Sequence, residues 1–277
     1  MINTRPRTWL LAGAASLAMS FGCFVRADVT GTAKLDGTAP EQKPIDMSAV
    51  AECNNLHPDP VTEENVVVND KGMLRYVVVS VKKEDSPDLP AGEMSKEPAV
   101  IDQKGCMYSP HVQAMMVGQQ LKINNSDPFL HNIHSLATTN PGFNKAQSNK
   151  TPEPEKAPEQ PKAAEYIRFK CDVHPWMSSC LAVFDHPYFG VSDENGKFTI
   201  KNVPDGDYTI HAWHEKLGEQ DQKVSVKGGK GEVNFTFKPE GAQAPAVSNV
   251  ILASDHGGPS KSCCDGMQKV EKVAASK

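Results

Sequence analysis

Three side chains that bind soft metals are concentrated in one short loop. Cys171, His174 and Met177 follow one another at three-residue intervals and offer a thiolate, an imidazole and a thioether. Ile167 and Phe169 share the alternating face of Cys171, so we expect the cysteine to be the last inward-pointing residue of a strand. A cysteine and a methionine combined with two histidines make a blue-copper electron-transfer site, so this pattern requires one more histidine.

A candidate for that histidine stands after a turn in residues 124–130. The chain resumes at His131 as a new segment, and His134 follows three residues later. Residues three apart on an extended chain point to opposite faces, so both histidines cannot easily line one pocket. We therefore expect His131 to be the further ligand, and His134 to lie at the surface or at the edge of the core.

The two loops together resemble those of amicyanin and plastocyanin, small type 1 copper proteins of the cupredoxin family. In these proteins a His-Asn pair after a turn supplies the first ligand, and a Cys-x2-His-x2-Met loop supplies the other three. The resemblance implies that His131, Cys171, His174 and Met177 hold one type 1 copper. It also implies that Asn132 ties the two ligand loops together near the thiolate.

Four motifs stand at residues 102–106, 110–112, 171–177 and 185–189. By these motifs the chain resembles still more closely the bacterial periplasmic proteins described as methylamine-utilisation-like or plastocyanin-like. The resemblance covers residues 28–238. By this resemblance, His174 is the ligand nearest the surface and the port for electrons. Pro175 and Trp176 would form part of the apolar patch where a redox partner docks in a small, transient contact.

Two other interpretations of the loop stay open. A buried cysteine and a surface histidine can fall close together by chance, although three soft ligands at this spacing on a strand end argue against that. Zinc is the other alternative, because Cys180 and His186 could complete a set with Cys171 and His174. Structural zinc loops usually pair Cys-x2-Cys, however, and Met177 would have no role in such a site.

Short alternating segments separated by turns run through the chain, and helical periodicity is scarce. We expect an all-β fold, in which residues 28–186 form the cupredoxin Greek-key β-sandwich implied by the resemblance. A small second β-sandwich module follows over residues 187–238. Its phrase G-x-F-x-I-x-x-V-P-x-G-x-Y, at residues 196–208, resembles carboxypeptidase regulatory-like or starch-binding-like modules. Because only four strands are evident there, we expect residues 29–35 to join its sheet, or the module to share a core with the copper domain.

Two stretches lack the composition of a packed core. Residues 149–164 hold four prolines among Glu, Lys and Gln. We expect them to form a flexible, solvated insertion without a site. Residues 239–277 are rich in Ala, Gly, Ser and Lys without a sustained period, which predicts a disordered tail.

The first 27 residues have the pattern of an export signal. Arg5 and Arg7 precede an apolar run, and Ala27 offers a small residue for cleavage. We expect a periplasmic or secreted protein, with lipoprotein anchoring at Cys23 as the less favoured alternative. No other run is apolar enough to cross a bilayer. Loss of three arginines with the signal changes the formal net charge from −5 to −8. This charge argues against nucleic acid and is compatible with a basic protein partner.

Six cysteines remain after signal removal, in a compartment where disulfides persist. Cys53 and Cys106 are predicted to form a disulfide that pins the loop before the first ligand strand. The alternative adds His57 and His111, which gives Cys-x3-His and Cys-x4-His and a second metal site. No role is assigned to Cys180, Cys263 and Cys264.

The expected function is reversible one-electron transfer rather than catalysis, because four protein ligands leave no position for a substrate. The partner would be another redox protein, such as a c-type cytochrome or a periplasmic dehydrogenase. One alternative is copper binding or storage without electron transfer. Another is a cell-surface module that binds a carbohydrate or protein and stacks a sugar on Trp213, which lies between His211 and His214. For Trp213 we favour packing over sugar binding.

Overall fold

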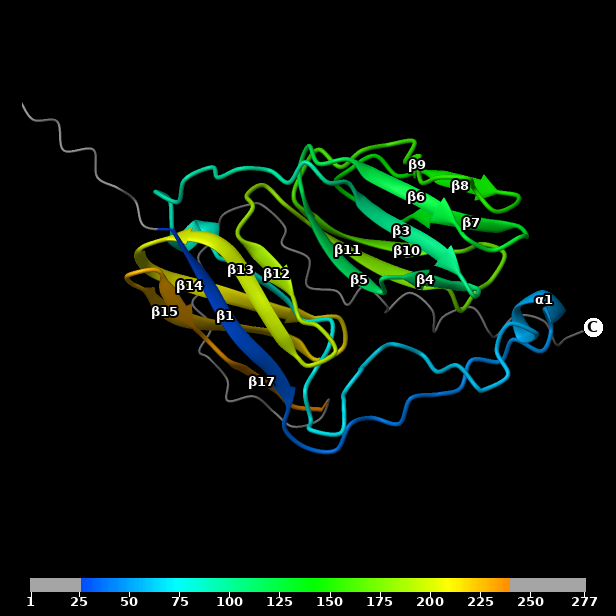
Figure 1. The fold of residues 1–277 in the computed structure, drawn as a ribbon, viewed down its shortest axis with the longest axis horizontal. Coiled ribbons are helices and arrows are strands. Elements are labelled where there is room, and N and C mark those ends of the chain that lie inside the picture. The colour runs from blue at the N-terminus through cyan, green and yellow to red at the C-terminus, as the bar shows by residue number, and fades with distance from the viewer. Residues whose placement is uncertain (1–25, 240–277) are drawn as a thin grey trace, which may run out of the picture.

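The computed structural model describes residues 26–239, and they form two β-sandwiches that lie side by side (Figure 1). The all-β class expected from the sequence is confirmed. Within the described range, the helical elements are the one-turn helix α1, Ala51–Asn54, and the short 3-10 helix η1, Lys83–Asp85. No helix there is long and apolar enough to span a membrane. Most of the predicted signal, and the predicted tail from residue 240, lie outside the described residues.

The first sandwich carries the predicted ligand loops. One of its sheets has the order β4-β3-β6-β9, and the other has the order β5-β11-β10-β7-β8. Side chains from both sheets meet in one core, in which Ile101, Ile133 and Phe169 are fully buried. The strands are β3 Ala99–Lys104, β4 Met107–Ser109, β5 Val112–Met116, β6 Leu121–Asn125, β7 His131–Ser135, β8 Asn144–Gln147, β9 Glu155–Lys156, β10 Glu165–Lys170 and β11 Ser178–Phe184.

The second sandwich draws strands from both ends of the described chain. Its sheets have the orders β13-β1-β16, with β17 also paired to β1, and β12-β2-β14-β15. The expected pairing of residues 29–35 with this module is confirmed, since β1 runs antiparallel to β13 and parallel to β16 and β17. The strands are β1 Arg26–Leu35, β2 Val78–Val81, β12 Phe189–Val191, β13 Lys197–Pro204, β14 Gly206–His214, β15 Gly218–Val226, β16 Lys230–Glu232 and β17 Phe235–Phe237.

The sheets therefore cross the sequence boundary predicted between residues 186 and 187. The strands after the boundary form one core with Val29 of β1 and with Val79 and Val81 of β2. The physical reason is core size, because a few short strands bury too little apolar surface to be stable alone. As domain limits, residues 28–186 and 187–238 stay a prediction.

A third apolar cluster joins the two sandwiches. Val78 of β2 and Trp213 of β14 pack there with Cys180 and Ala182 of β11. The ring of Trp213 lies 4.6 Å from that of Tyr166, measured between centroids, and the tryptophan is only 7% exposed. The favoured packing role of Trp213 is thus confirmed, and its ring offers no open face on which a sugar could stack.

Residues 149–164 are ordered against the edge of β6, contrary to the expected solvated insertion. Strand β9 pairs with β6, and Ala157 is buried. The side chain of Gln160 accepts a hydrogen bond from Leu121 N at 2.7 Å. Prolines prevent a long regular strand here, but the polar side chains between them satisfy the exposed edge of the sheet. A composition argument overlooks that kind of edge packing.

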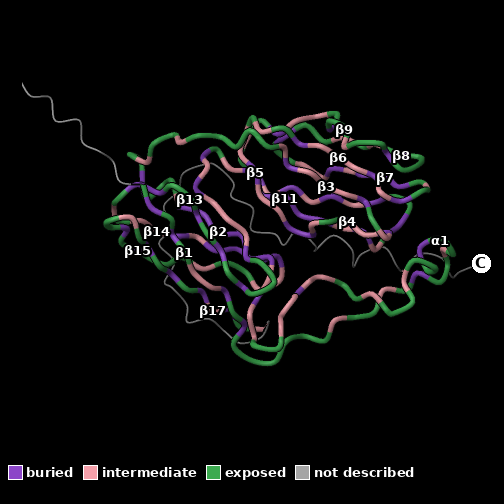
Figure 2. The backbone as a smooth tube through the Cα atoms, viewed as in Figure 1, coloured by how far each residue is buried: buried purple, intermediate pink, exposed green. Residues whose placement is uncertain are grey.

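A long connection between β1 and β2 links the second sandwich to the first. Figure 1 shows the chain leaving the end of β1, running to α1 beside the first sandwich and returning toward β2. Ile45 N donates to Val61 O at 2.8 Å, which closes residues 45–61 into a loop that we term the cap. Figure 2 shows that the connection is largely exposed or half-buried, whereas parts of the cap near α1 are buried.

Candidate metal centre

The ligand loop is a tight connection between β10 and β11. Ile167, Phe169 and Cys171 are buried, as expected for one face of a strand that ends at the cysteine. Met177 N donates to His174 O at 3.0 Å, and Cys171 N donates to Met177 O at 3.3 Å. These backbone bonds fold the loop back on itself, so its three predicted ligands are presented from one compact turn.

The structure brings three predicted ligands together. His131 Nδ1 lies 3.0 Å from His174 Nδ1, and Cys171 Sγ lies 3.7 Å from that same nitrogen. Donor atoms of the three residues fall within 4.8 Å of one another, and all three residues are buried. Met177 is fully buried in the same apolar cluster as Cys171. A group of soft and imidazole donors this close together can hold a single copper ion.

Asp127 fixes the orientation of the His131 ring, a role that was not predicted. His131 Nε2 lies 2.8 Å from Asp127 Oδ2, so this nitrogen donates to the carboxylate and Nδ1 is directed toward Cys171 and His174. Burial raises the pKa of Asp127, but hydrogen bonds from His131 and from the N–H groups of Cys106 and Gly105 outweigh it and hold the pKa below its usual value. An aspartate four residues before a candidate ligand, at a strand end, is the sequence signal that could have revealed it.

The turn between β3 and β4 presents these two N–H groups. Gly105 and Cys106 have φ values of 62° and 55°, the left-handed conformation of both central residues in a two-residue hairpin turn. Gly105 N donates to Asp127 Oδ1 at 2.8 Å, and Cys106 N donates to Asp127 Oδ2 at 2.9 Å. The turn thereby connects the disulfide cysteine to the carboxylate that orients His131.

Asn132 joins the two ligand loops. Its Oδ1 accepts a hydrogen bond from Asp172 N at 3.0 Å, across from β7 to the residue after Cys171. Its backbone also contributes a hydrogen bond to the Cys171 sulfur. Asn132 thus connects the two loops next to Cys171.

The environment of Cys171 favours the thiolate, which is the form that binds metals. Burial raises the pKa of the thiol. That effect is outweighed by a hydrogen bond with His131 and by the backbone N–H groups of His174, Val173 and Asn132, so the pKa lies below its usual value. His174 N, for example, lies 3.3 Å from Cys171 Sγ. The pKa of His174 is lowered by burial and by the nearby His131, which favours the neutral imidazole that a metal requires.

His174 is not at the surface, contrary to what the resemblance implies. It is only 2% exposed, whereas Pro175 beside it is exposed. Trp176 is half-buried, and its Nε1–H donates to Cys106 O at 3.0 Å. The cap lies close by, because donor atoms of Cys53, Cys106 and His174 fall within 4.8 Å of one another. An N-terminal segment far away in sequence therefore covers the ligand that was expected to be the electron port.

The predicted Cys53–Cys106 disulfide is confirmed, with its two Cα atoms 5.6 Å apart. His57 and His111, considered with these cysteines as a second metal site, have other partners. His57 Nε2 lies 2.7 Å from Gly105 O, and His111 Nε2 bonds Glu215 of the second sandwich. The four residues are therefore not assembled as one metal site.

The other histidines and cysteines considered from the sequence lie apart from this centre. His134 is half-buried and pairs with Asp172 at 3.0 Å, in agreement with the expected place at the edge of the core. Cys180 is buried in the cluster between the sandwiches, and the ring of His186 packs against Phe184. Among the described residues, neither Cys180 nor His186 belongs to a group of three potential ligands. The zinc set is therefore not assembled.

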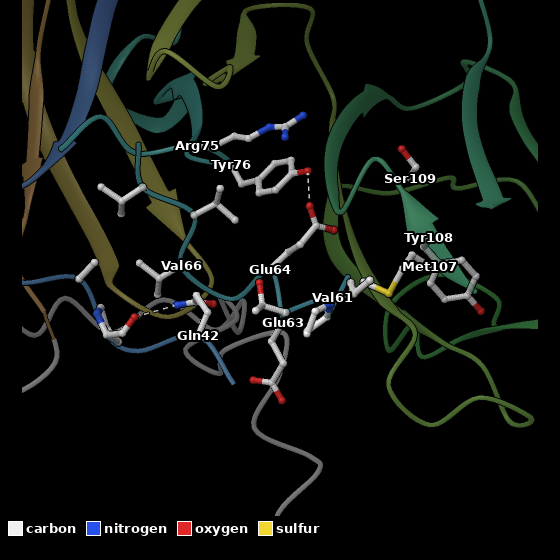
Figure 3. Close-up of a pocket in the computed structure, with 16 residues that line it drawn as sticks. Gln42, Val61, Glu63, Glu64, Val66, Arg75, Tyr76, Met107, Tyr108 and Ser109 are labelled. Carbon is white, nitrogen blue, oxygen red and sulfur yellow. Dashed lines mark hydrogen bonds between the residues drawn. The ribbon is translucent and has the colours of Figure 1, made fainter. Parts of the chain in front are cut away.

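A cavity of about 710 Å³ lies beside β4, between the β1–β2 connection and the first sandwich (Figure 3). Tyr76 Oη donates to Glu64 Oε1 at 3.0 Å on its wall, and burial, followed by the charge of Glu64, raises the pKa of Tyr76 to about 12. Val61, Tyr108 and Ser109 line the side toward the first sandwich. No residue of the three potential ligand groups in the described chain lines this cavity.

Comparison with known proteins gives partial matches. A family model described as polysaccharide lyase family 4, domain II, matches residues 181–233, less than half of the chain. No curated protein matches the chain.

Several solved structures are similar to part of the chain, and three of them follow. A copper-containing nitrite reductase from Thermus scotoductus is 18% identical over 34% of this chain, with a TM-score of 0.28, and only 24% of the reductase is covered. A purple cupredoxin from Nitrosopumilus maritimus is 21% identical over 31% of this chain and 98% of its own, with a TM-score of 0.25. An oxidized amicyanin variant is 16% identical over 38% of this chain and 97% of its own, with a TM-score of 0.28. At such TM-scores the similarity carries no argument, so the functional proposal rests on the site itself.

Proposed function

We propose that this chain is an exported, cupredoxin-like type 1 copper protein that carries single electrons between redox partners. The observation that carries the proposal is the convergence of His131 Nδ1, Cys171 Sγ and His174 Nδ1 in a buried site. Met177 completes the ligand set from the same loop. Bound copper would supply a one-electron couple between Cu(II) and Cu(I).

The donor set fits copper better than it fits zinc or a hard cation. Zinc takes thiolate, imidazole and carboxylate ligands, so Met177 would have no role in a zinc site. A thiolate and a thioether favour Cu(I), whereas two imidazoles also suit Cu(II), so one set of ligands serves both oxidation states. Hard cations prefer oxygen, and the carboxylate nearest to the site, that of Asp127, is already occupied by His131 and by two backbone N–H groups. The residues present therefore fit a copper ion.

The protein contributes rigidity and the exclusion of water. Asp127 fixes one imidazole, and Asn132 connects the two loops. His131 and His174 are both buried, which keeps solvent from the donor atoms. Ligands that cannot move keep the cost of changing oxidation state low. With four protein ligands, no position is left for a substrate, so we propose an electron carrier rather than an enzyme.

The partner and compartment belong to the same proposal. The predicted signal in residues 1–27 and the net charge of −8 after its removal support export and a basic redox protein as partner, such as a c-type cytochrome or a periplasmic dehydrogenase. The exposed Pro175 and the half-buried Trp176 would form part of the docking patch.

The test is the visible spectrum of the purified mature protein with added Cu(II). We expect a strong thiolate-to-copper band in the wild type and its loss in Cys171→Ser. Cys180→Ser is the matched control, because Cys180 is a buried thiol on the strand that follows the ligand loop. It should keep the band. A wild type without the band, despite bound copper, would contradict the proposal.

Copper binding or storage without electron transfer is the second candidate function, and the burial of His174 favours it. An imidazole that is 2% exposed beneath the cap offers a partner no direct contact with the ligand. Voltammetry of the copper-loaded protein, followed by mixing with a c-type cytochrome, separates the two functions. A reversible one-electron wave with rapid exchange supports the carrier. Stable copper binding with no exchange supports storage.

A further inference from the structure

The Cys53–Cys106 disulfide lies directly beside the candidate copper centre. Donor atoms of Cys53, Cys106 and His174 fall within 4.8 Å of one another, and all three residues are buried. Cys106 also forms such a group with Asp127 and His131. A disulfide that only anchored a loop could be located anywhere along the edge of the sandwich. This one places two sulfur atoms against a metal ligand.

The disulfide also connects two separate parts of the fold. Cys106 belongs to the turn between β3 and β4, whereas Cys53 lies on α1 of the cap. The cap is also attached to this end of the sandwich by apolar packing and by His57, whose Nε2 contacts Gly105 O. Met47 is buried in the core, and Ile45, Val50 and Val61 pack against it. The helix α1 has a single turn, and Leu56 beside it is 44% exposed. Because Cys53 and Cys106 are buried, a reductant can reach their disulfide only through a local opening of the cap.

We propose that Cys53 and Cys106 form a second, redox-controlled copper site, in which their reduced sulfurs and the His174 imidazole hold one Cu(I). Soft thiolates select Cu(I), and this buried pair offers two of them. The site shares His174 with the type 1 centre of the proposed function, but it needs neither Cys171 nor Met177. In the oxidised state the sulfurs are bonded to each other and the cap is held closed over His174.

The switch between the two states is a thiol–disulfide exchange. A dithiol reductant attacks one sulfur, forms a mixed disulfide and then closes its own disulfide, which releases Cys53 and Cys106 as two thiols. The protein gains two electrons and two protons, and the dithiol loses the same number. Binding of Cu(I) then displaces the two thiol protons, since the thiolate is the ligand.

Cu(I) affinity is measured by competition with bicinchoninate in the full mature chain, without oxygen. Every chain carries Cys171→Ser, which disables the type 1 site, and Cys263→Ser with Cys264→Ser, since those tail thiols would bind Cu(I) themselves. A water-soluble phosphine is the reductant, because it adds no thiol. We expect reduction to tighten Cu(I) binding at least about tenfold. X-ray absorption at the copper edge should then show sulfur neighbours.

The decisive control adds Cys53→Ser and Cys106→Ser to the same chain. This variant lacks the disulfide, so its cap is untethered, but it offers no thiolates. We expect weak Cu(I) binding with or without reductant. If it binds as tightly as the reduced parent, the gain comes from opening of the cap, and the proposal is wrong.

Two further measurements make every outcome decisive. Thiol counting after a denaturing quench shows whether the native chain was reduced. A disulfide that resists the reductant in the native protein also overturns the proposal. Circular dichroism checks that both variants keep their β-structure. The type 1 proposal is tested independently by the Cu(II) spectrum of the chain that retains Cys171, so failure of one does not imply failure of the other.

Discussion

His131 Nε2 lies 2.8 Å from Asp127 Oδ2, and this single contact determines which ring nitrogen faces the other predicted ligands. The same carboxylate accepts the N–H groups of Gly105 and Cys106. Asp127 therefore connects three elements: the strand that carries a ligand, the hairpin turn and the disulfide. The positions of the predicted metal-binding side chains therefore depend on Asp127, which would not itself bind the metal.

Replacement of Asp127 should weaken copper binding without removing a ligand. In Asp127→Ala the His131 ring loses its orienting acceptor, and we expect copper affinity to fall about 10–100-fold. Asp127→Asn retains an acceptor oxygen, so its copper affinity should lie between those of the wild type and Asp127→Ala. Chelator competition measures the affinity. An unchanged affinity in Asp127→Ala would show that packing alone orients the ring.

Asn132→Ala should loosen the connection between the ligand loops. The Asp172 N–H then loses its acceptor at 3.0 Å, which should cost about 1–3 kcal/mol of the free energy of unfolding. Urea unfolding measures this loss, and the charge-transfer band of the Cu(II) form should shift or broaden. His134→Ala is a suitable control, since it removes a more exposed side chain that also pairs with Asp172. His134→Ala should change the free energy of unfolding and the charge-transfer band less than Asn132→Ala does.

Thr151→Val tests whether residues 149–164 contribute to stability. Thr151 Oγ1 accepts from Asn125 N at 3.0 Å and lies 2.7 Å from Asn124 Oδ1, just before the turn that leads to His131. Valine keeps the shape but satisfies neither group, so we expect a loss of about 1–3 kcal/mol. In the wild type, amide hydrogen exchange should show protection at Ala157, whose N donates to Leu121 O at 3.0 Å. Fast exchange throughout 149–164 would restore the solvated-insertion interpretation.

The sequence was sufficient where short-range pattern controls structure. Alternation of Ile167, Phe169 and Cys171 predicted a strand that ends at the cysteine, and the structure buries that face. The Cys53–Cys106 pairing also followed from the count of cysteines and their compartment. The strand prediction depends on residues close together in the sequence, and the disulfide prediction depends on the chemistry of cysteine in an oxidising compartment, whatever the fold.

The sequence was insufficient where distant segments pack. Nothing local in residues 45–61 indicates that they cover His174, because that contact depends on where the chain between β1 and β2 crosses the first sandwich. The pairing of β2 with β12 and β14 is likewise a choice among many strands of similar pattern. Side-chain hydrogen bonds that satisfy a sheet edge, such as that of Gln160, cannot be inferred from composition.

Acidification should weaken the fold through His214, which is buried on β14 near the contact between the sandwiches. Lys216 N and Leu217 N both lie near its Nδ1, at 3.2 and 3.3 Å, so this nitrogen must stay unprotonated to accept them. Burial, reinforced by the nearby His111 and Lys216 charges against the opposing effect of Glu215, lowers the pKa of His214 to about 4. Since the folded pKa lies below the unfolded value near 6.5, the stability is fully present above pH 6.5 and is lost as the pH falls toward 4.

Between pH 6.5 and pH 4, protonation of His214 should lower the free energy of unfolding by about 3 kcal/mol, from the difference between its unfolded and folded pKa values. His214→Asn keeps an acceptor near the two N–H groups and cannot titrate, so its free energy of unfolding should decline less between pH 7 and pH 4.5 than that of the wild type. Urea denaturation at several pH values measures both slopes. His211→Asn, on the same strand but more exposed, keeps His214 and should keep the part of the loss that His214 causes, although it removes the partner of Asp221. Equal slopes in the wild type and His214→Asn would assign the loss to the carboxylates instead.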